Sequence, residues 1–337
     1  MKDEGSRFLI VRTDRLGDVV LTLPMARVIK EQFPSAHVLF LVRNYTRPIV
    51  ERCPDVDSIM TLDATKSIVE QIGLFRGARA DAVFFPSPRF RLALAAFLAR
   101  VPKRVGTAYR WYSFLFNVRI KDHRKTAERH EAEYNMRMLS NIGFAADLKT
   151  FPSLTLLSSE EAAVRSWLRR ELQEHARYAV LHIGSGGSAM EWPAAHFIEL
   201  AKRLPKVLEI VLTGMNVERE RLDAVQKSLP GAHLFIDHPL PELAALLKQA
   251  SLVVSSSTGP GHLAAALGTP SIGLFPLRRV LSKERWGFRG PRATNLSPEP
   301  LRSCPNCEHC TCMERLTVET VVRHIPADVA ERSPAIS

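Results

Sequence analysis

The stretch LVVSSSTGPGHLAAALGTP, residues 252–270, passes from an apolar strand through a turn of small polar residues into a helix of small residues. Pro260 suits the first turn of a helix because its missing N–H would have no partner there, and Gly259 lets a ligand approach the backbone. Gly268 predicts the helix end. The free N–H groups and the positive end of the helix dipole favour an anion such as phosphate at this turn. The alternative is an ordinary β-α-β turn without a ligand.

Apolar runs typical of buried strands alternate with helix-like stretches along the whole chain. The expected strands are 8–11, 37–42, 58–62, 82–85, 103–106, 178–183, 209–213, 233–236, 252–254 and 271–275. Amphipathic stretches at 19–33 and 89–100 are among the expected helices. This alternation predicts an α/β protein with doubly wound parallel sheets that are covered on both faces.

We expect two such domains, residues 1–157 and 158–337, because the length suffices for two apolar cores. The boundary is placed where FPSLTLLSSE, residues 151–160, changes from an extended, proline-containing segment to a helix start. Ligands of open α/β sheets bind beyond the carboxyl ends of the strands. The sequence therefore predicts a site in the cleft between the two domains.

The excess of positive charge lies in the first half of the chain. Residues 1–158 hold 25 Lys and Arg against 16 Asp and Glu, whereas the remainder holds 21 against 19. Basic and aromatic side chains are interleaved between residues 100 and 129. Such a stretch favours an anionic binding partner, which could be nucleic acid, an acidic membrane surface or a phosphorylated acceptor. The alternative is a basic face that is only solvated. No nucleic-acid-binding motif accompanies it, so we expect no nucleic acid partner.

The amino-terminal segment MKDEGSRFLIVRTD has acidic residues and an apolar run too short for a signal peptide. No run of about 18 apolar residues occurs elsewhere. We therefore expect a cytoplasmic protein.

The first expected strand leads into RTDRLGDVV, residues 12–20, after which apolar residues follow a helical spacing. Gly17 permits a tight turn, and Asp18 then lies at the start of the helix. An acid at this place either complements the helix dipole, which contributes less than about 1 kcal/mol, or acts as a general base. The helix amino terminus favours its ionised form.

Two further loops follow expected strands in the second half. The loop HIGSGGS, residues 182–188, is glycine-rich, but it has neither the ending of a P-loop nor a complete G-x-G-x-x-G. The segment TGMNVE, residues 213–218, ends the next strand. Glu218 either accepts hydrogen bonds from ribose or sugar hydroxyls or is an ordinary acid at a helix start.

Together these segments resemble glycosyltransferase family nine, the bacterial lipopolysaccharide heptosyltransferases. The similarity extends over nearly the whole chain. Its most specific elements are RTDRLGDVVLTLP at 12–24, Trp192-Pro193, Gly214 with Glu218, and Thr258-Gly259-Pro260 with HLAAALGTP at 262–270. The family implies the GT-B architecture of two Rossmann-like domains. The acceptor then binds the first domain, and the nucleotide-sugar, typically ADP-heptose, binds the second.

The resemblance also implies an inverting transfer without a metal, in which Asp18 is the catalytic base. The donor-binding residues are then Ser185, Gly186, Met190, Gly214, Glu218, Ser257, Thr258, Gly259 and His262. Among these, Thr258, Gly259 and His262 are placed to hold the charge of the leaving group. The expected acceptor-binding residues are Arg12, Arg15 and Arg110. An anionic lipid-linked saccharide suits their charge, and implies peripheral contact with the inner membrane.

Two positions depart from the family pattern. Met190 stands where heptosyltransferases commonly have a lysine that meets the donor phosphates, and Ser257 stands where they commonly have an aspartate. The donor is therefore either ADP-heptose or another nucleotide-sugar, with Arg278, Arg279 or Lys283 as candidates for the missing positive charge. An alternative from a different class is a nucleotide- or anion-binding relative that has lost transferase activity.

Four cysteines and a histidine lie in CPNCEHCTC, residues 304–312. Cys304, Cys307, Cys310 and Cys312 either bind a structural Zn or Fe–S centre, remain reduced in a loop, or pair as disulfides, which a reducing compartment disfavours. Similar cysteines that end in Cys-Met occur in family nine. The expected chemistry requires no cofactor, so a metal here would be structural.

Overall fold

The computed structural model describes residues 5–147, 149–172, 176–187, 189–300 and 311–331. The chain forms two compact units, Met1–Thr155 and Leu156–Ser337, and this division lies two residues from the boundary expected from the sequence. Each unit contains a six-stranded sheet. None of the helices in the described part of the chain is long and apolar enough to cross a membrane.

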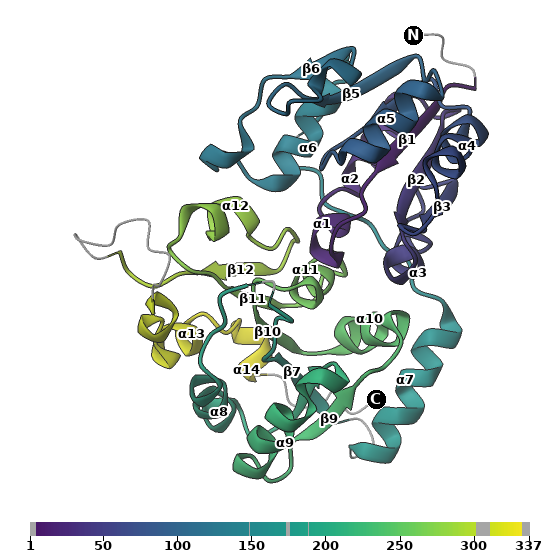
Figure 1. The fold of residues 1–337 in the computed structure, drawn as a ribbon. Coiled ribbons are helices and arrows are strands. Elements are labelled where there is room, and N and C mark those ends of the chain that lie inside the picture. Colours follow the sequence, from purple (N-terminus) through teal and green to yellow (C-terminus); the bar gives the residue numbers. More distant parts are fainter. Residues whose placement is uncertain (1–4, 148, 173–175, 188, 301–310, 332–337) are drawn as a thin grey trace. The chain divides into compact units, whose positions relative to one another are not determined.

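The sheet of the first unit has the strand order β3-β2-β1-β4-β5-β6, and its strand pairs are parallel (Figure 1). This is the order of a Rossmann fold, in which the direction of winding reverses between the first and fourth strands. The strands are β1 (Arg7–Val11), β2 (His37–Arg43), β3 (Ser58–Leu62), β4 (Ala82–Phe84), β5 (Lys103–Thr107) and β6 (Val118–Ile120). The helices are α1 (Leu16–Val20), α2 (Pro24–Gln32), α3 (Arg47–Val50), α4 (Ile68–Ala78), α5 (Phe90–Leu98) and α6 (Glu131–Ser140).

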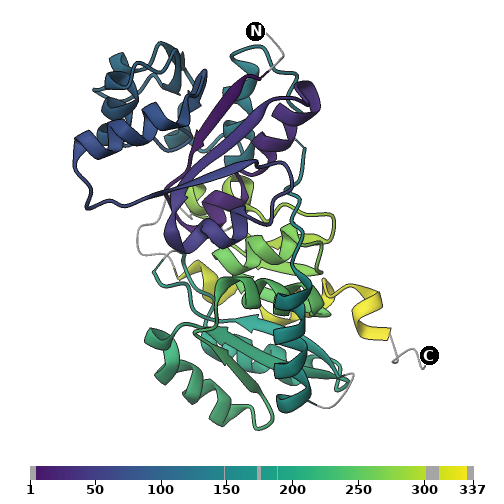
Figure 2. The same ribbon diagram turned by 90° about the vertical axis from the view of Figure 1, so that its right-hand side faces the viewer.

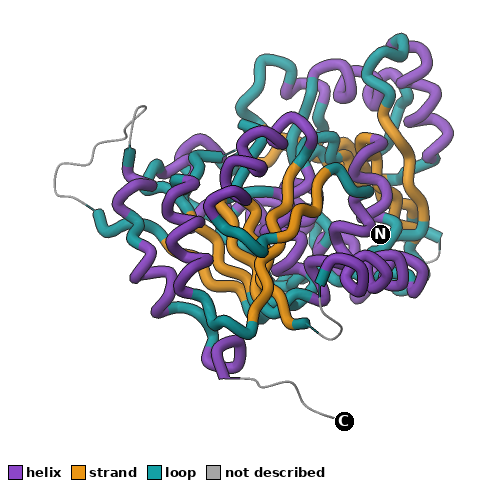
Figure 3. The backbone as a smooth tube through the Cα atoms, turned by 90° about the horizontal axis from the view of Figure 1, so that it is seen from below, coloured by secondary structure: helices purple, strands orange, loops and turns teal. Residues whose placement is uncertain are grey.

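Both faces of this sheet are covered, as its near-continuous apolar strands predict. Alternate residues of β1 belong to different core clusters, with Phe8 and Ile10 in one and Leu9 and Val11 in the other. The first cluster includes side chains of α2 and α6, and the second includes side chains of α4 and α5. Figure 3 colours the strands of the chain orange and the helices purple, and helices lie alongside the strands. The two layers of helices cover the faces of the sheet, so the loops at the carboxyl ends of its strands are the part of the sheet that is available for a site.

One expected helix is divided in two. The stretch 19–33 predicts a single helix, but the structure has α1 and α2 with a turn at 21–23 between them. Pro24 explains the break because proline has no N–H to donate to the carbonyl four residues earlier, and its ring disfavours a continuing helix. Pro24 instead occupies the first turn of α2. Asp18 consequently lies in a short helix of its own, a few residues after β1.

The sheet of the second unit has the order β12-β11-β10-β7-β8-β9, again with parallel pairs (Figure 2). Counted from β7, this is the same Rossmann order as in the first unit. The strands are β7 (Arg177–His182), β8 (Leu208–Gly214), β9 (His233–Ile236), β10 (Leu252–Ser256), β11 (Ser271–Leu274) and β12 (Ala293–Leu296). The helices are α7 (Ser158–Glu171), α8 (Ala194–Arg203), α9 (Arg219–Ser228), α10 (Leu240–Gln249), α11 (Gly259–Ala266), α12 (Lys283–Trp286), α13 (Val318–Arg323) and α14 (Ala327–Glu331).

The helix predicted after β10 is present as α11. Pro260 lies in its first turn, and Gly268 follows its end with a φ of +80°, a conformation that glycine adopts without strain. A Cβ atom at Gly261 would lie 2.1 Å from Phe288 Cζ and 2.4 Å from Ser255 Oγ. Glycine at this position therefore lets α11 pack closely against β10 and Phe288.

The ten expected strands are all present, and the described part of the chain contains two further strands that were not predicted. The additional strands β6 and β12 each lie at an edge of their sheet. They are short, and the polar residues Arg119 and Asn295 interrupt their apolar pattern. An edge strand needs fewer apolar residues than a central one, so the sequence carries little signal for it.

Candidate functional site

Each unit presents loops at the point where its strand order reverses. In the first unit β1 and β4 are neighbours, and the loops that follow them meet where Asp14 Oδ1 and Arg89 Nη2 are 3.3 Å apart. In the second unit β7 and β10 are neighbours, and the backbone N–H of Trp192 donates to Ser256 Oγ at 3.0 Å. Ligands of open α/β sheets bind at such switch points. The topology thus selects the same loops that the sequence motifs selected.

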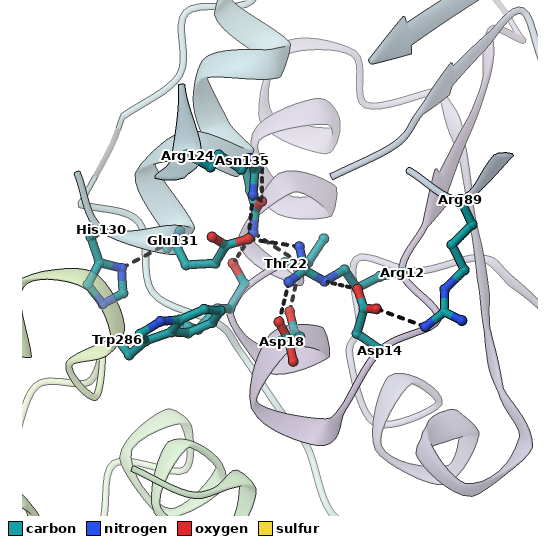
Figure 4. A network of polar contacts seen from close by, with 12 residues as sticks. Arg12, Asp14, Asp18, Thr22, Arg89, Arg124, His130, Glu131, Asn135 and Trp286 are labelled. Carbon is teal, nitrogen blue, oxygen red and sulfur yellow. Dashed lines mark hydrogen bonds and ion pairs between the residues drawn. The ribbon is translucent and has the colours of Figure 1, made fainter. Parts of the chain in front are cut away.

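Arg12, directly after β1, contacts three carboxylates (Figure 4). Its side chain is 2% exposed, and it donates from Nη2 to Asp18 and from Nη1 to Glu131 at 3.0 Å. Its Nε atom lies 3.2 Å from Asp14 Oδ2. Buried charges persist in a protein when they are paired, and this cation has three partners. Asp18 is therefore held in one orientation while 20% of its side chain stays exposed.

A second cation, from the 3-10 helix η3 (Arg124–Thr126), and an amide from α6 extend this network. Arg124 donates to Glu131 and, at 3.2 Å, to Asn135 Oδ1. Asn135 donates from Nδ2 to Thr22 Oγ1 at 3.1 Å, and Thr22 Oγ1 donates to the backbone carbonyl of Asp18 at 2.7 Å. Helix α6 thus fixes both the side chain and the backbone of the turn that carries Asp18.

These contacts set the protonation of the site. Burial raises the pKa of Asp18, Arg12 lowers it, and Glu131 and Asp14 raise it, with a result above the ordinary value of an aspartate. Burial alone would lower the pKa of Arg12, but the three carboxylates raise it above its ordinary value, so Arg12 stays charged. A carboxylate with a raised pKa is a stronger proton acceptor. The arrangement is chemically suited to a general base at Asp18.

The three arginines predicted to bind an acceptor lie in different surroundings. Arg15 and Arg110 are exposed. The backbone N–H of Arg110 donates to Ser113 Oγ at 3.0 Å, which fixes the turn that carries it. Arg12 is buried and engaged by its three carboxylates. Its surroundings therefore suit the positioning of Asp18 better than direct contact with an acceptor.

In the second unit, Glu218 joins the loops that follow β7 and β8. Its carboxylate accepts hydrogen bonds from the backbone N–H of Met215 at 3.1 Å and of Gly186 at 3.4 Å. A Cβ atom at Gly184 would lie 1.8 Å from Glu218 Oε1, and one at Gly214 would lie 3.0 Å from Oε2. The two glycines make room for the carboxylate. The structure thus brings Gly186, Gly214 and Glu218 together, as three residues of the predicted donor site.

The segment between this loop and α8 contains Met190. Met190 is half-buried and packs against the apolar core of the unit. Beside it, Glu191 accepts a hydrogen bond from Arg221 Nη1 at 2.5 Å. Burial raises the pKa of Glu191, but hydrogen bonds from Arg221 and Ser185 bring it below its ordinary value. Arg221 of α9 is therefore a cation near position 190 that the sequence did not single out.

The turn from β10 into α11 exposes part of its backbone. Ser257 and Gly259 are half-buried, whereas Thr258 and His262 are each 3% exposed. The ring of His262 packs edge-on against Phe288, with 4.9 Å between the centroids. Thr258 and His262 support the shape of the turn from inside, and Ser257 and Gly259 lie at its accessible rim.

Comparison with known proteins places this arrangement in a family. The model of "Glycosyltransferase family 9 (heptosyltransferase)" matches residues 75–316, a range that includes the loops after β7, β8 and β10. The chain belongs to glycosyltransferase family 9. It is accordingly a glycosyltransferase of the heptosyltransferase type.

The relatives of this family 9 enzyme match most of its length. It is 27% identical over 298 residues to a putative glycosyltransferase of Haemophilus influenzae, which covers 83% of this chain and 85% of the relative. A family 9 glycosyltransferase from Veillonella parvula superposes with a TM-score of 0.81 at 18% identity, over 98% of this chain and 99% of the other. Escherichia coli ADP-heptose lipopolysaccharide heptosyltransferase II superposes with a TM-score of 0.76 at 21% identity, over 96% and 98%. These matches confirm the predicted GT-B fold.

The family motifs identified Asp18 but not the residues that hold it in this family 9 enzyme. Arg12 and Glu131 are 119 residues apart in the sequence, and Thr22 and Asn135 are 113 apart. An acid in the first turn of a helix, as Glu131 is, ordinarily indicates only a favourable interaction with the dipole. One available signal was the spacing of Glu131 and Asn135, which lie one turn apart on the same side of α6.

Cys312 is the member of the predicted cysteine cluster that the structure describes. It is 1% exposed and lies in the apolar core of the second unit. Cys304, Cys307 and Cys310 lie outside the described residues. Within the described ranges, no group of three or more His, Cys, Asp and Glu side chains is arranged to hold a metal ion. The structural Zn or Fe–S centre stays a prediction.

Proposed function

We propose that this enzyme transfers heptose, or a closely related sugar, from a nucleotide-sugar to a lipopolysaccharide core or a similar cell-envelope saccharide, with inversion and without a metal. The observation that carries the proposal is Asp18, whose carboxylate is held by buried Arg12 and remains 20% exposed. The E. coli structure with the same fold is that of an ADP-heptose enzyme, which supports ADP-heptose as the donor.

In the proposed reaction Asp18 takes the proton of the acceptor hydroxyl while the hydroxyl oxygen attacks the anomeric carbon of the sugar. The new C–O bond forms opposite the bond to the nucleoside diphosphate, which breaks, so the configuration inverts. Burial and neighbouring carboxylates raise the pKa of Asp18, which improves it as a base. We assign to Arg12 the positioning of this carboxylate, in place of the acceptor contact predicted from the sequence.

The donor diphosphate is proposed to bind at the amino-terminal end of α11. The first N–H groups of the helix and its dipole favour the negative charge that develops on the leaving group. Gly259 lets the diphosphate approach the backbone, and Thr258 and His262 keep the turn in shape. We propose that Ser185 and Gly186 complete this site, and that Glu218 orders their loop through the backbone instead of binding ribose.

The acceptor is proposed to be anionic because the exposed cations Arg15 and Arg110 lie in the unit that carries most of the positive charge. A phosphorylated lipid-linked saccharide has the complementary charge. The cytoplasmic face of the inner membrane is accordingly the proposed location of the reaction.

The proposal is tested with purified enzyme, ADP-heptose and lipopolysaccharide from a heptose-deficient strain, with ADP release and the mass of the acceptor as readouts. We expect one added sugar, and a loss of about 10²–10⁴-fold in kcat for Asp18→Asn, the range typical of a missing general base. Glu128→Gln, at an exposed acid of the same unit, is the control and retains activity. Failure to transfer sugar to any such acceptor would overturn the proposal, and it would favour the alternative of a relative without transferase activity.

Met190 and Ser257 are uncharged where the family commonly has charged residues, so the nucleotide of the donor has to be identified by measurement. Thermal-shift titrations with ADP-, GDP- and UDP-sugars compare the candidates, since a ligand at 100 times its Kd stabilises the folded state by about 2.7 kcal/mol. We expect the largest shift with the ADP-sugar. A larger shift with a GDP- or UDP-sugar would replace ADP-heptose as the proposed donor.

A further inference from the structure

We propose that the outer face of α5 and the adjoining 3-10 helix η2 (Ser113–Leu115) bind a membrane surface that contains anionic lipids. This α5–η2 surface consists of the exposed side chains of Phe90, Phe97, Leu98, Trp111 and Phe114. Binding to a lipid surface is a property separate from the proposed sugar transfer, and it is measured without any transfer reaction.

Helix α5 is labelled in Figure 1. Apart from the exposed Arg91 its residues are apolar, both on the side that faces the sheet and on the outer side. Leu92 and Ala96 are buried against the sheet, whereas Phe90, Phe97 and Leu98 are 37%, 42% and 43% exposed. A surface helix normally carries polar residues on its outer side, and a helix that is apolar all round is normally covered. The outer side of α5 is therefore suited to an apolar partner.

Aromatic side chains of the following loop continue this face. The ring of Trp111, which is 73% exposed, lies 4.7 Å from that of Phe90 between centroids. Near the other end of α5, the guanidinium of Arg104 lies 5.3 Å from the ring centre of Phe97. Arg104 also donates from Nε to the backbone carbonyl of Leu115 at 2.8 Å, which joins this end of the helix to η2. The exposed apolar side chains thus form one surface.

The segment of the chain that carries this surface is strongly basic. Residues 82–121 include eight Lys and Arg and neither Asp nor Glu. Arg91, Arg100 and Arg110 are exposed. Aromatic side chains favour the interface between lipid and water, and each nearby Lys or Arg strengthens binding to an anionic membrane by about fivefold.

An apolar centre with a basic surround matches the acyl chains and headgroups of anionic lipids. A second copy of the chain would bring two sets of like charges together, which opposes self-association. Nucleic acid would pair with the basic residues and stack on aromatic rings, but the aliphatic Leu98 adds nothing to such stacking. The lipid surface accounts for all five apolar side chains.

The test is flotation of the full chain with vesicles of phosphatidylethanolamine and phosphatidylglycerol, compared with vesicles of phosphatidylcholine alone. We expect wild type to float with the anionic vesicles, and high salt to weaken this binding. The double variant Trp111→Ser, Phe114→Ser should bind at least about tenfold more weakly. Arg91→Gln with Arg100→Gln should weaken binding by roughly 25-fold at low salt.

Val69→Ser is the matched control, because Val69 is an apolar side chain of the same unit that is 72% exposed and lies on α4. It should float as wild type does. The far-ultraviolet circular dichroism spectrum and the melting curve, which include the first unit that carries all the substitutions, should be the same in wild type and in every variant. These readouts separate loss of the surface from loss of folding.

The inference would be overturned if wild type stayed at the bottom of the gradient in the presence of anionic vesicles. It would also be overturned if the Trp111/Phe114 variant floated as well as wild type. If wild type does not bind vesicles but forms a dimer that this variant abolishes, the surface is reassigned to a second copy of the chain. If it instead forms a complex with an oligonucleotide that the variant abolishes, the surface is reassigned to nucleic acid. Vesicle binding without sugar transfer would retain the lipid surface and reject the proposed function alone.

Discussion

Replacing Glu131 by glutamine should shift the acid limb of the activity profile to lower pH. Burial raises the pKa of Asp18 most, and the carboxylate of Glu131 raises it further. Both carboxylates bind the guanidinium of Arg12, at different nitrogens. Glu131→Gln keeps the size of the side chain and an oxygen for Arg12 but removes the negative charge. The pKa of Asp18 should therefore fall.

The size of this shift follows from the shared guanidinium. Two carboxylates on neighbouring nitrogens of one guanidinium are roughly 5 Å apart, and two unit charges at that distance interact by about 3 kcal/mol at an effective dielectric constant of about 20. Since 1.36 kcal/mol corresponds to one pKa unit, this is an upper limit of about two units. The exposed part of Asp18 is screened by solvent, so we expect a shift of about one unit.

The assay is the pH dependence of kcat/KM, whose acid limb reports the pKa of the essential base in the free enzyme. The limb should move down by about one pH unit in Glu131→Gln. A less basic Asp18 should also lower the plateau of kcat by about threefold, because proton-transfer rates follow basicity. Thermal melts and ADP titrations in parallel show whether the variant is folded.

Glu128→Gln is the matched control, since it removes the same charge from an exposed position of the same unit. It should leave the acid limb in place. A Glu131→Gln profile that coincides with that of wild type would refute the electrostatic link between Glu131 and Asp18. Lower activity at every pH without a shift would show that Glu131 has only a structural role.

Three further predictions concern donor binding and stability. Gly184→Ala should weaken ADP binding by roughly tenfold in isothermal titration, because its Cβ would lie 1.8 Å from Glu218 Oε1 and displace a carboxylate that holds two backbone N–H groups. Gly77→Ala, which has no atom within 4 Å of the added Cβ, should leave the affinity unchanged. Met190→Lys should tighten ADP binding by about fivefold if the side chain at 190 faces the diphosphate, and an unchanged Kd removes that residue from the donor site. Burial raises the pKa of Asp18 in the folded protein, so the stability that protonated Asp18 contributes at low pH is lost as the pH rises through its folded-state pKa. Asp18→Asn should therefore melt at a higher temperature than wild type near pH 8 but not near pH 3. A lower melting temperature of the variant near pH 8 would contradict this sign.

The fold could be predicted wherever a structural element depends on local sequence. Strands such as β2 and β10 are near-continuous apolar runs because a parallel sheet buries both of its faces. The bounds of α11 follow from Pro260 and Gly268, whose backbone preferences are intrinsic. The edge strands β6 and β12 and the break before Pro24 were missed. Edge strands bury little, and an amphipathic pattern continues through a proline that divides the helix.

The candidate site could be predicted only in part, since motifs name residues but not their surroundings. Asp18 was identified from its loop, yet the burial of Arg12 depends on Glu131, which lies 119 residues away. The sequence left two alternative roles for Glu218, a contact with sugar hydroxyls or an ordinary acid at a helix start. In the structure its carboxylate accepts hydrogen bonds from the N–H groups of Gly186 and Met215, which is a third role. Such contacts depend on which loops the topology brings together.

Asp18→Asn decides whether Asp18 is the base of a glycosyl transfer. Single-turnover transfer from ADP-heptose to a heptose-deficient lipopolysaccharide is measured together with the Kd of ADP. With Asp18 as the base, we expect a transfer rate lower by about 10²–10⁴-fold and a Kd within about twofold of wild type. A variant that transfers sugar at the rate of wild type would contradict it.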